Sequence, residues 1–324
     1  MERPTVGVIG VGIMGEPMAR NLLRAGYRVC VNSRTKSKAD RLLGEGAVGK
    51  DSPATLAREV DVIISMVSDS PDVEAVYLGP AGVCEGLRKG TLCIDMSTIA
   101  PETAKAVAGE VEKRGGRFLD APVSGGKTGA EAGKLCIMVG GRAEDVARAQ
   151  PIFDVLGKLT VHCGPVGHGQ LTKLCNQILC ALNLLAVSEA MVFARRVGLD
   201  PSVMLKAVSA GAAGSWALDN LGSRMIARDF APMFMIDLQQ KDLRIALATA
   251  RENSVPLPGT ALASQLLAAN QAAGEGREGT QALVKTLERL AGLYPSSTVV
   301  GQVNPRSCSE TRIFEQNQLR SLKT

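Results

Sequence analysis

The fold is decided by residues 5–21, TVGVIGVGIMGEPMARN. A short β-branched run leads into a glycine turn, and an apolar pattern with helical period follows it. Between a strand and a helix, the spacing Gly10-x-Gly12-x-x-Gly15 is typical of a dinucleotide site, because the glycines permit a tight turn, close approach of a pyrophosphate and close helix packing. The alternative is a purely structural turn. We assign Gly10, Val11, Gly12, Ile13, Met14 and Gly15 to cofactor binding.

Strand-like runs at 28–31, 60–67 and 92–95 alternate with helical stretches along the first half of the chain. This alternation predicts an α/β fold with an N-terminal Rossmann-type, doubly wound parallel sheet covered by helices on both faces. We also assign Met66, Val67 and Ser68, which close or follow the run 60–67, to the cofactor site.

The end of the second predicted strand, VNSRTKSK at 31–38, indicates which dinucleotide binds. Many NAD enzymes carry an acidic residue here for the ribose 2′-hydroxyl, whereas this chain has Ser33 followed by Arg34. Arg34, with Thr35 and the nearby lysines, can donate charge-assisted hydrogen bonds to a 2′-phosphate. A solvated basic turn is the alternative. We place Asn32, Ser33, Arg34 and Thr35 in the site and expect NADP(H), with NAD(H) possible.

The stretch DAPVSGGKTGAEAGKL at 120–135 predicts a loop that exposes backbone N–H groups and the Ser124 hydroxyl. Such a loop suits a carboxylate, so Ser124, Gly125 and Gly126 are expected to bind substrate; a turn without a ligand is the alternative. The same letters contain S-x-x-K and K-T-G, but acylating serine enzymes place these motifs on separate elements with separate lysines. We therefore set that function aside.

The second half begins with about thirty residues of apolar helical pattern that end at Gly198, and shorter helical stretches follow it. A helix that is apolar almost all round must be buried in its own domain or against a second subunit, so we expect a homodimer or homotetramer. The expected domains are a nucleotide-binding domain at 1–165, an all-α substrate and oligomerisation domain at 166–293 joined by the long interdomain helix, and a disordered C-terminal tail at 294–324.

Lys173, Asn176 and Gln177 recur at i, i+3 and i+4 near the start of that helix, so the three side chains share one face. An ammonium between leucines, beside two amides, is a candidate acid/base group. The commoner fate of such a lysine is to extend its charged end to water. His168, which we expect in a glycine-flanked loop, is the rival acid/base.

The composition excludes several classes of function. The chain has 324 residues, a net charge of +5 and no run of five or six basic residues. We therefore expect no nucleic-acid or membrane surface, and we expect a small, anionic partner. We saw no apolar run close to the roughly 18 residues that span a bilayer, and no signal peptide, and expect a cytoplasmic protein. The eight cysteines form no C-x-x-C pair, so no metal site is expected.

Four stretches together resemble the β-hydroxyacid dehydrogenase family: GVIGVGIMGEPMARNLLRAG, DAPVSGGKTGAEAGKL, GHGQLTKLCNQ and QQKDLRIAL. The resemblance runs from residue 5 to about 292. It implies that Lys173 is the catalytic lysine, that Ser124 to Gly126 hold the substrate carboxylate, that Lys241 and Asp242 lie near the nicotinamide and that Thr98 contacts the cofactor. Val11 stands where leucine is usual, and Gln177 where several relatives have asparagine, which leaves open whether Asn176 or Gln177 orients the substrate.

The resemblance also implies an oxidoreductase that transfers a hydride between NADP(H) and a small carboxylate-bearing aldehyde or hydroxy acid. Three stretches in the second half are most similar to members that reduce 2-hydroxy-3-oxopropionate (tartronate semialdehyde) to glycerate. Dehydrogenation of 3-hydroxyisobutyrate and reduction of glyoxylate or succinic semialdehyde are the alternatives. Two further alternatives are weaker. A noncatalytic NADP-binding protein would need neither Lys173 nor the SGG loop. The imine reductases have a similar architecture but generally replace that lysine.

Overall fold

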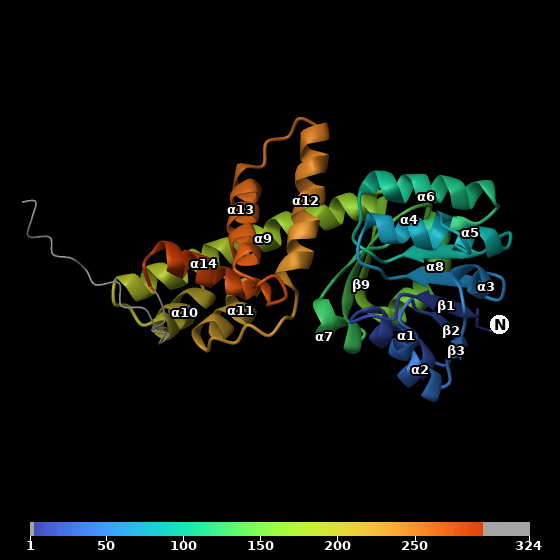
Figure 1. The fold of residues 1–324 in the computed structure, drawn as a ribbon, viewed down its shortest axis with the longest axis horizontal. Coiled ribbons are helices and arrows are strands. Elements are labelled where there is room, and N and C mark those ends of the chain that lie inside the picture. Colours follow the sequence, from blue (N-terminus) through green and yellow to red (C-terminus); the bar gives the residue numbers. More distant parts are fainter. Residues whose placement is uncertain (1–2, 294–324) are drawn as a thin grey trace, which may run out of the picture.

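The computed structural model describes residues 3–293, so the tail expected at 294–324 lies outside the described residues. Figure 1 shows a sheet with its covering helices on one side and a group of helices on the other, with helix α9 running from the first into the second. Strands and helices alternate up to Gly164, and every named element from there to residue 293 is helical.

The elements follow one another as strands and helices in the first half and as helices in the second. In the first half they are β1 Val6–Ile9, α1 Gly15–Arg24, β2 Val29–Asn32, η1 Lys36–Lys38, α2 Asp40–Gly44, β3 Val48–Gly49, α3 Pro53–Ala57, β4 Val62–Ser65, α4 Ser70–Leu78, α5 Val83–Gly86, β5 Leu92–Asp95, α6 Pro101–Lys113, β6 Arg117–Asp120, β7 Val123–Ser124, α7 Gly126–Glu131, β8 Leu135–Gly140, α8 Ala143–Leu156 and β9 Gly157–Gly164. In the second half they are α9 His168–Arg196, α10 Pro201–Ser209, α11 Trp216–Ile226, α12 Ile236–Glu252, α13 Pro258–Ala272, η2 Thr280–Ala282 and α14 Leu283–Leu290.

The sheet has the strand order β3-β2-β1-β4-β5-β6-β8-β7, and β9 pairs with β8. Strands β1 to β6 pair in parallel, which confirms the predicted Rossmann-type sheet. One strand departs from this parallel arrangement, since β8 runs antiparallel to both β6 and β7. Only a short helix, α7, separates β7 from β8, and a parallel return needs a crossover of about a dozen residues or more.

Two hydrophobic cores cover the two faces of the sheet. Alternate residues of β1 face opposite ways, so Val8 packs with Met18 of α1 and Phe153 of α8, whereas Ile9 packs in the cluster that contains Leu56 of α3. This burial on both faces is the reason the strands carry almost unbroken apolar runs. It also fixes the carboxyl ends of the strands, where cofactor residues were predicted, along one edge.

The long helix α9 has 29 residues and packs against α11, α12, α13 and α14. Its C-terminal stop at Gly198 is confirmed, since that glycine has φ +77°. Contrary to our expectation from the sequence, α9 is long and apolar enough to span a membrane by length and composition, but half of the relevant window is buried inside the protein, as in a core helix. Helix α14, which the sequence analysis did not single out, packs against α9.

One side of α9 nevertheless stays exposed. Five exposed positions, four on the helix and one directly after it, recur at intervals that place them within about 40° of one another around the helix axis. Leu179 is 62% exposed and Phe193 67% exposed. We define the α9 stripe as Cys175, Leu179, Ala186, Phe193 and Val197.

Candidate active site

The glycine turn after β1 has the geometry that close backbone approach requires. Gly10 has φ +93°, and a Cβ there would lie 2.3 Å from the Met66 carbonyl oxygen. A Cβ at Gly15 would lie 2.0 Å from the Gly10 carbonyl oxygen, so helix α1 could not start so near the strand with any other residue. Around Gly12, by contrast, a Cβ would meet nothing within 4 Å. That open space is where a pyrophosphate was expected.

The first turn of α1 is also suited to an anion. Met14 is its N-cap and makes no side-chain capping bond, so the first N–H groups of the helix are not capped by that side chain. Ile13 is 57% exposed beside them. These residues therefore fit the phosphates of a dinucleotide.

At the end of β2 the predicted cofactor residues separate into two kinds. Asn32 is buried and its Nδ2 donates to the Lys50 carbonyl oxygen at 2.9 Å, so it braces the loop after β3. The side chain of Arg34 is 93% exposed and lies 3.7 Å from an Asp72 oxygen on α4. An exposed pair of this kind contributes little to stability. The Arg34 guanidinium is thus available to a ligand.

The buried carboxyl group of Asp95 connects two segments that are predicted to bind the cofactor, Met66–Ser68 and the turn that carries Thr98. The hydroxyls of Ser65 and Ser97 donate to Asp95 Oδ1 at 2.7 and 2.8 Å, and Ser97 Oγ accepts the Val67 N–H at 2.9 Å. Burial raises the pKa of Asp95 to about 6, and hydrogen bonds from Ser65 and Ser97 oppose that rise. Asp95 Oδ2 is buried and has no hydrogen-bond partner. The network joins the Met66–Ser68 segment to the turn that carries Thr98.

Helix α12 reaches this edge of the sheet from the helical half (Figure 1). The Nζ atom of Lys241 donates to the Thr98 carbonyl oxygen at 2.5 Å and lies 2.8 Å from Asp242 Oδ1. Arg244 pairs with Asp69, the N-cap of α4, at 2.6 Å. Two charged side chains of α12 therefore contact the nucleotide-binding half.

Lys173 is 7% exposed and lies on the same face of α9 as its two amides. Burial lowers the pKa of its ammonium group, while the negative charge of Asp242 opposes that shift. Gln177 Nε2 donates to Asp242 Oδ2 at 2.5 Å, and Asn176 Nδ2 donates to Gln177 Oε1 at 2.7 Å. The structure thus joins Lys173, Asn176, Gln177 and Asp242 in one polar cluster inside an apolar surrounding.

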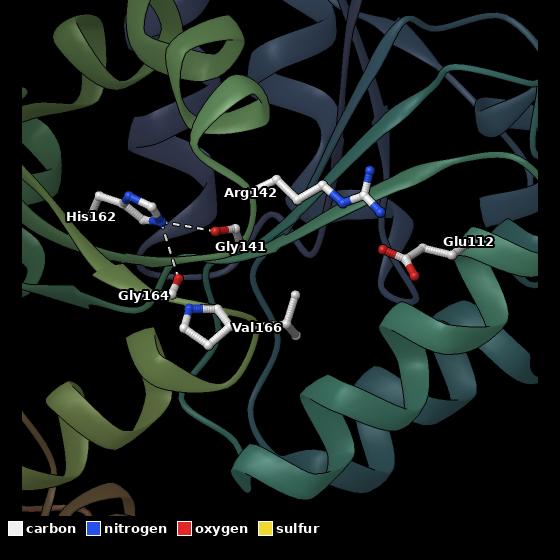
Figure 2. A pocket seen from close by; sticks show the side chains of 7 residues that line it. Glu112, Gly141, Arg142, His162, Gly164 and Val166 are labelled. Atoms are coloured by element: carbon white, nitrogen blue, oxygen red, sulfur yellow. Dashed lines mark hydrogen bonds between the residues drawn. The ribbon is translucent and has the colours of Figure 1, made fainter.

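The histidines lie elsewhere. His168 is exposed and is the first residue of α9, not part of a loop as expected. Lys173 follows it by five positions, which places the two side chains about 140° apart around the helix. His162 lines a pocket of 550 Å³ with Glu112 and Arg142, and the residues that line this pocket include none of the predicted site residues (Figure 2). Its Nε2 is within 2.8 Å of the Gly141 carbonyl oxygen, which ties the ring to the backbone.

The SGG segment is more regular than predicted. Ser124 ends strand β7, Gly125 with φ +131° is the N-cap of α7, and Gly126 with φ +60° begins that helix. Both φ values favour glycine, because a Cβ would strain the backbone. A Cβ at Gly126 would lie 3.6 Å from the Met233 carbonyl oxygen, just before α12. The segment therefore faces the helical half, as a substrate-binding loop between the domains would.

Asp120, at the end of β6, fixes the start of α9. Its two oxygens accept the N–H groups of Gly167 and Gln170 at 2.7 and 2.8 Å. Burial raises the pKa of Asp120 to about 6, and these hydrogen bonds oppose the rise. A Cβ at Gly169 would lie 2.6 Å from the Asp120 carbonyl oxygen. The glycines before Lys173 are thus needed to bring the helix onto the sheet.

The comparisons with known proteins agree with this geometry. Residues 5–164 match the NAD binding domain of 6-phosphogluconate dehydrogenase, and residues 167–287 match the NAD-binding domain of NADP-dependent 3-hydroxyisobutyrate dehydrogenase. The 2-hydroxy-3-oxopropionate reductase of Escherichia coli strain K12 is 44% identical over 286 residues, which are 88% of this chain and 98% of that protein. The chain belongs to the β-hydroxyacid dehydrogenase family.

Solved structures of the family share the fold. The 3-hydroxyisobutyrate dehydrogenase of Mycobacterium tuberculosis with L-serine superposes with a TM-score of 0.82 at 31% identity, covering 88% of this chain and 99% of that one. Psf3 in complex with NADP+ and 2-OPP has a TM-score of 0.80 at 27% identity over 87% of this chain and all of that one. This chain is therefore an NAD(P)-dependent hydroxyacid dehydrogenase, which confirms the predicted enzyme class over the noncatalytic alternative.

Several residues of this dehydrogenase site were missed from the sequence. Asp95 and Asp120 each end an apolar strand, in LCID and RFLD, and a carboxylate in that position was the available signal. Gln170 carries no such signal, because the partners of its side chain are backbone atoms of a segment far away in the sequence.

Proposed function

We propose that this enzyme reduces a short aldehyde acid with NADPH, with 2-hydroxy-3-oxopropionate as the substrate and glycerate as the product. The observation that carries the reaction type is the buried Lys173, set in a polar cluster with Asp242 and two amides. The choice of substrate is supported by the 44% identity to the reductase of that name over nearly its full length.

The roles of the residues follow from their positions. When bound, NADPH supplies the hydride. Ser124 and the N–H groups of Gly125 and Gly126 bind the substrate carboxylate, which fixes the aldehyde oxygen toward α9. Lys173 donates a proton to that oxygen as negative charge grows on it, an effect typically worth about 10²–10⁴-fold.

The two amides have different tasks in this proposal. Gln177 is 3% exposed and donates to Asp242, so it holds the carboxylate that keeps the lysine charged. Asn176 is half-buried and is the amide that orients the substrate oxygen. In the reverse direction neutral Lys173 accepts the hydroxyl proton, and the lowered pKa makes the neutral form available nearer neutral pH.

Three further properties belong to the proposal. Arg34, exposed and free of any strong partner, selects NADP(H) by binding the 2′-phosphate, while NAD(H) is a weaker substrate. The α9 stripe is covered by a second copy of the chain, which gives a homodimer or homotetramer. The location is cytoplasmic, in keeping with seven free thiols among residues 3–293.

The proposal is tested by steady-state oxidation of NADPH with four acids: 2-hydroxy-3-oxopropionate, methylmalonate semialdehyde, succinic semialdehyde and glyoxylate. We expect the highest kcat/KM for 2-hydroxy-3-oxopropionate. A higher value for methylmalonate semialdehyde would reassign the enzyme to 3-hydroxyisobutyrate, and a higher value for succinic semialdehyde or glyoxylate would reassign it to those acids. No turnover with any of them would overturn the proposal.

A further inference from the structure

Gln170 lies one turn before Lys173 on α9 and is completely buried. Its side-chain oxygen accepts the Ile99 N–H at 3.1 Å, and its Nε2 donates to the Ser97 carbonyl oxygen at 2.9 Å. The two backbone partners, Ser97 and Ile99, are the residues directly before and after Thr98. A single side-chain amide therefore joins α9, the helix that carries Lys173, to the turn that follows β5.

That turn is fixed from two other directions as well. Ser97 Oγ donates to Asp95 at its base, and the Thr98 carbonyl oxygen accepts from Lys241 of α12. Of the three elements that hold the turn, only α9 also carries the proposed proton donor. A displacement of α9 relative to the turn would therefore change where the ammonium group lies with respect to a nicotinamide beside Thr98.

We infer that Gln170 is a positioning residue, which sets the distance between the Lys173 ammonium group and the nicotinamide by tying α9 to the Ser97–Ile99 turn. It touches neither substrate nor cofactor in this role. Residues three apart in a helix rise by only about 4.5 Å, so the tie lies close to the group that it positions. A misplacement of about 1 Å between reacting groups can cost about 10²-fold in rate. The inference rests on the proposed function for its kinetic consequence.

The test compares Gln170→Met with a matched control, Gln281→Met. Gln281 is also completely buried and its Nε2 also donates to backbone oxygens, those of Asp229 at 2.9 Å and Ala231 at 3.2 Å, but these partners lie in the helical half and not in the turn. Both variants lose a buried amide of the same size. Any loss of stability that comes only from removing a buried amide should therefore appear in both variants.

We expect hydrogen–deuterium exchange at the Ile99 amide to rise at least about tenfold in Gln170→Met and to stay unchanged in Gln281→Met. In single turnovers with NADPH and 2-hydroxy-3-oxopropionate, we expect hydride transfer to slow by about 10–100-fold in Gln170→Met only. The deuterium isotope effect on kcat with deuterated NADPH should rise in the same variant, because hydride transfer becomes more rate-limiting.

The outcomes separate the two proposals. If wild-type enzyme reduces none of the acids, the proposed function is wrong, and exchange at Ile99 alone decides the inference about Gln170. If Gln170→Met resembles Gln281→Met in exchange, rate and isotope effect, and differs only in stability, Gln170 is merely structural and the inference is overturned. If Gln170→Met does not fold, Gln170→Glu replaces it. Its carboxylate keeps the shape and the oxygen that accepts the Ile99 N–H, but has no hydrogen for the Ser97 carbonyl oxygen. An unchanged rate of hydride transfer and an unchanged isotope effect in that variant would equally overturn the inference.

Discussion

Replacing Lys173 with methionine removes one ammonium group and keeps most of the volume and helix propensity of the side chain. The structure sets the size of the effect. The wild-type side chain is only 7% exposed, so little water is near to replace the lost donor. General acid catalysis is worth about 10²–10⁴-fold, and at about 1.36 kcal/mol for each factor of ten the transition state loses roughly 2.7–5.4 kcal/mol.

Folding should survive this change. Asp242 would lose one positive neighbour but would keep Lys241 at 2.8 Å and the hydrogen bond from Gln177. The desolvation of the buried ammonium, which lowers its pKa, would also disappear. We therefore expect the melting temperature to change by only a few degrees. NADPH binding, followed by fluorescence, should be retained.

The assay is the kcat of NADPH oxidation at saturating aldehyde acid, for Lys173→Met, Lys173→Arg and His168→Ala. Lys173→Arg should not restore the rate, because a guanidinium does not release its proton near neutral pH. His168 is exposed and points away, so His168→Ala should change kcat less than about threefold. Near wild-type kcat in Lys173→Met, together with lost turnover in His168→Ala, would refute the role given to the lysine.

Three other predictions follow from the same geometry. Arg34→Ala should raise the KM for NADPH by roughly tenfold, because a charge-assisted hydrogen bond to the 2′-phosphate is lost, and should leave the KM for NADH nearly unchanged. A wild-type enzyme that prefers NADH would contradict this role of Arg34. In the reduction direction Lys173 must be protonated, so kcat/KM falls as pH rises through its pKa. Because the charge of Asp242 raises that pKa, Asp242→Asn should move the falling limb of the pH profile to lower pH, and a shift to higher pH would exclude this coupling. Phe193→Asp should halve the mass measured by light scattering at micromolar concentration, whereas a wild-type monomer would show that the α9 stripe is not an interface.

The sequence predicted those parts of the protein whose signals are local. The β-branched run before Gly10 and the apolar period of α9 depend on neighbours within a few residues, and both elements formed where they were expected. The antiparallel direction of β8 depends on the length of its connection, and β8 is not among the strand-like runs recognised in the sequence. The bonds of Gln170 and the approach of Lys241 to Thr98 join residues more than seventy positions apart, and nothing in the local pattern indicates them.

The anchoring of α9 at one end has a mechanical consequence. From Gln170 to Arg196 the helix extends about 39 Å, so a rotation of α9 about its anchored end would have its fulcrum at the contact with Asp120 and the Ser97–Ile99 turn. A swing of about 5° around that fulcrum would carry the far end through about 3 Å, but would move Lys173, about 4.5 Å away, by only about 0.4 Å. Such a rotation of the helical half would leave the proton donor almost still, but it would have to break the contacts that Lys241 and Arg244 of α12 make with Thr98 and Asp69.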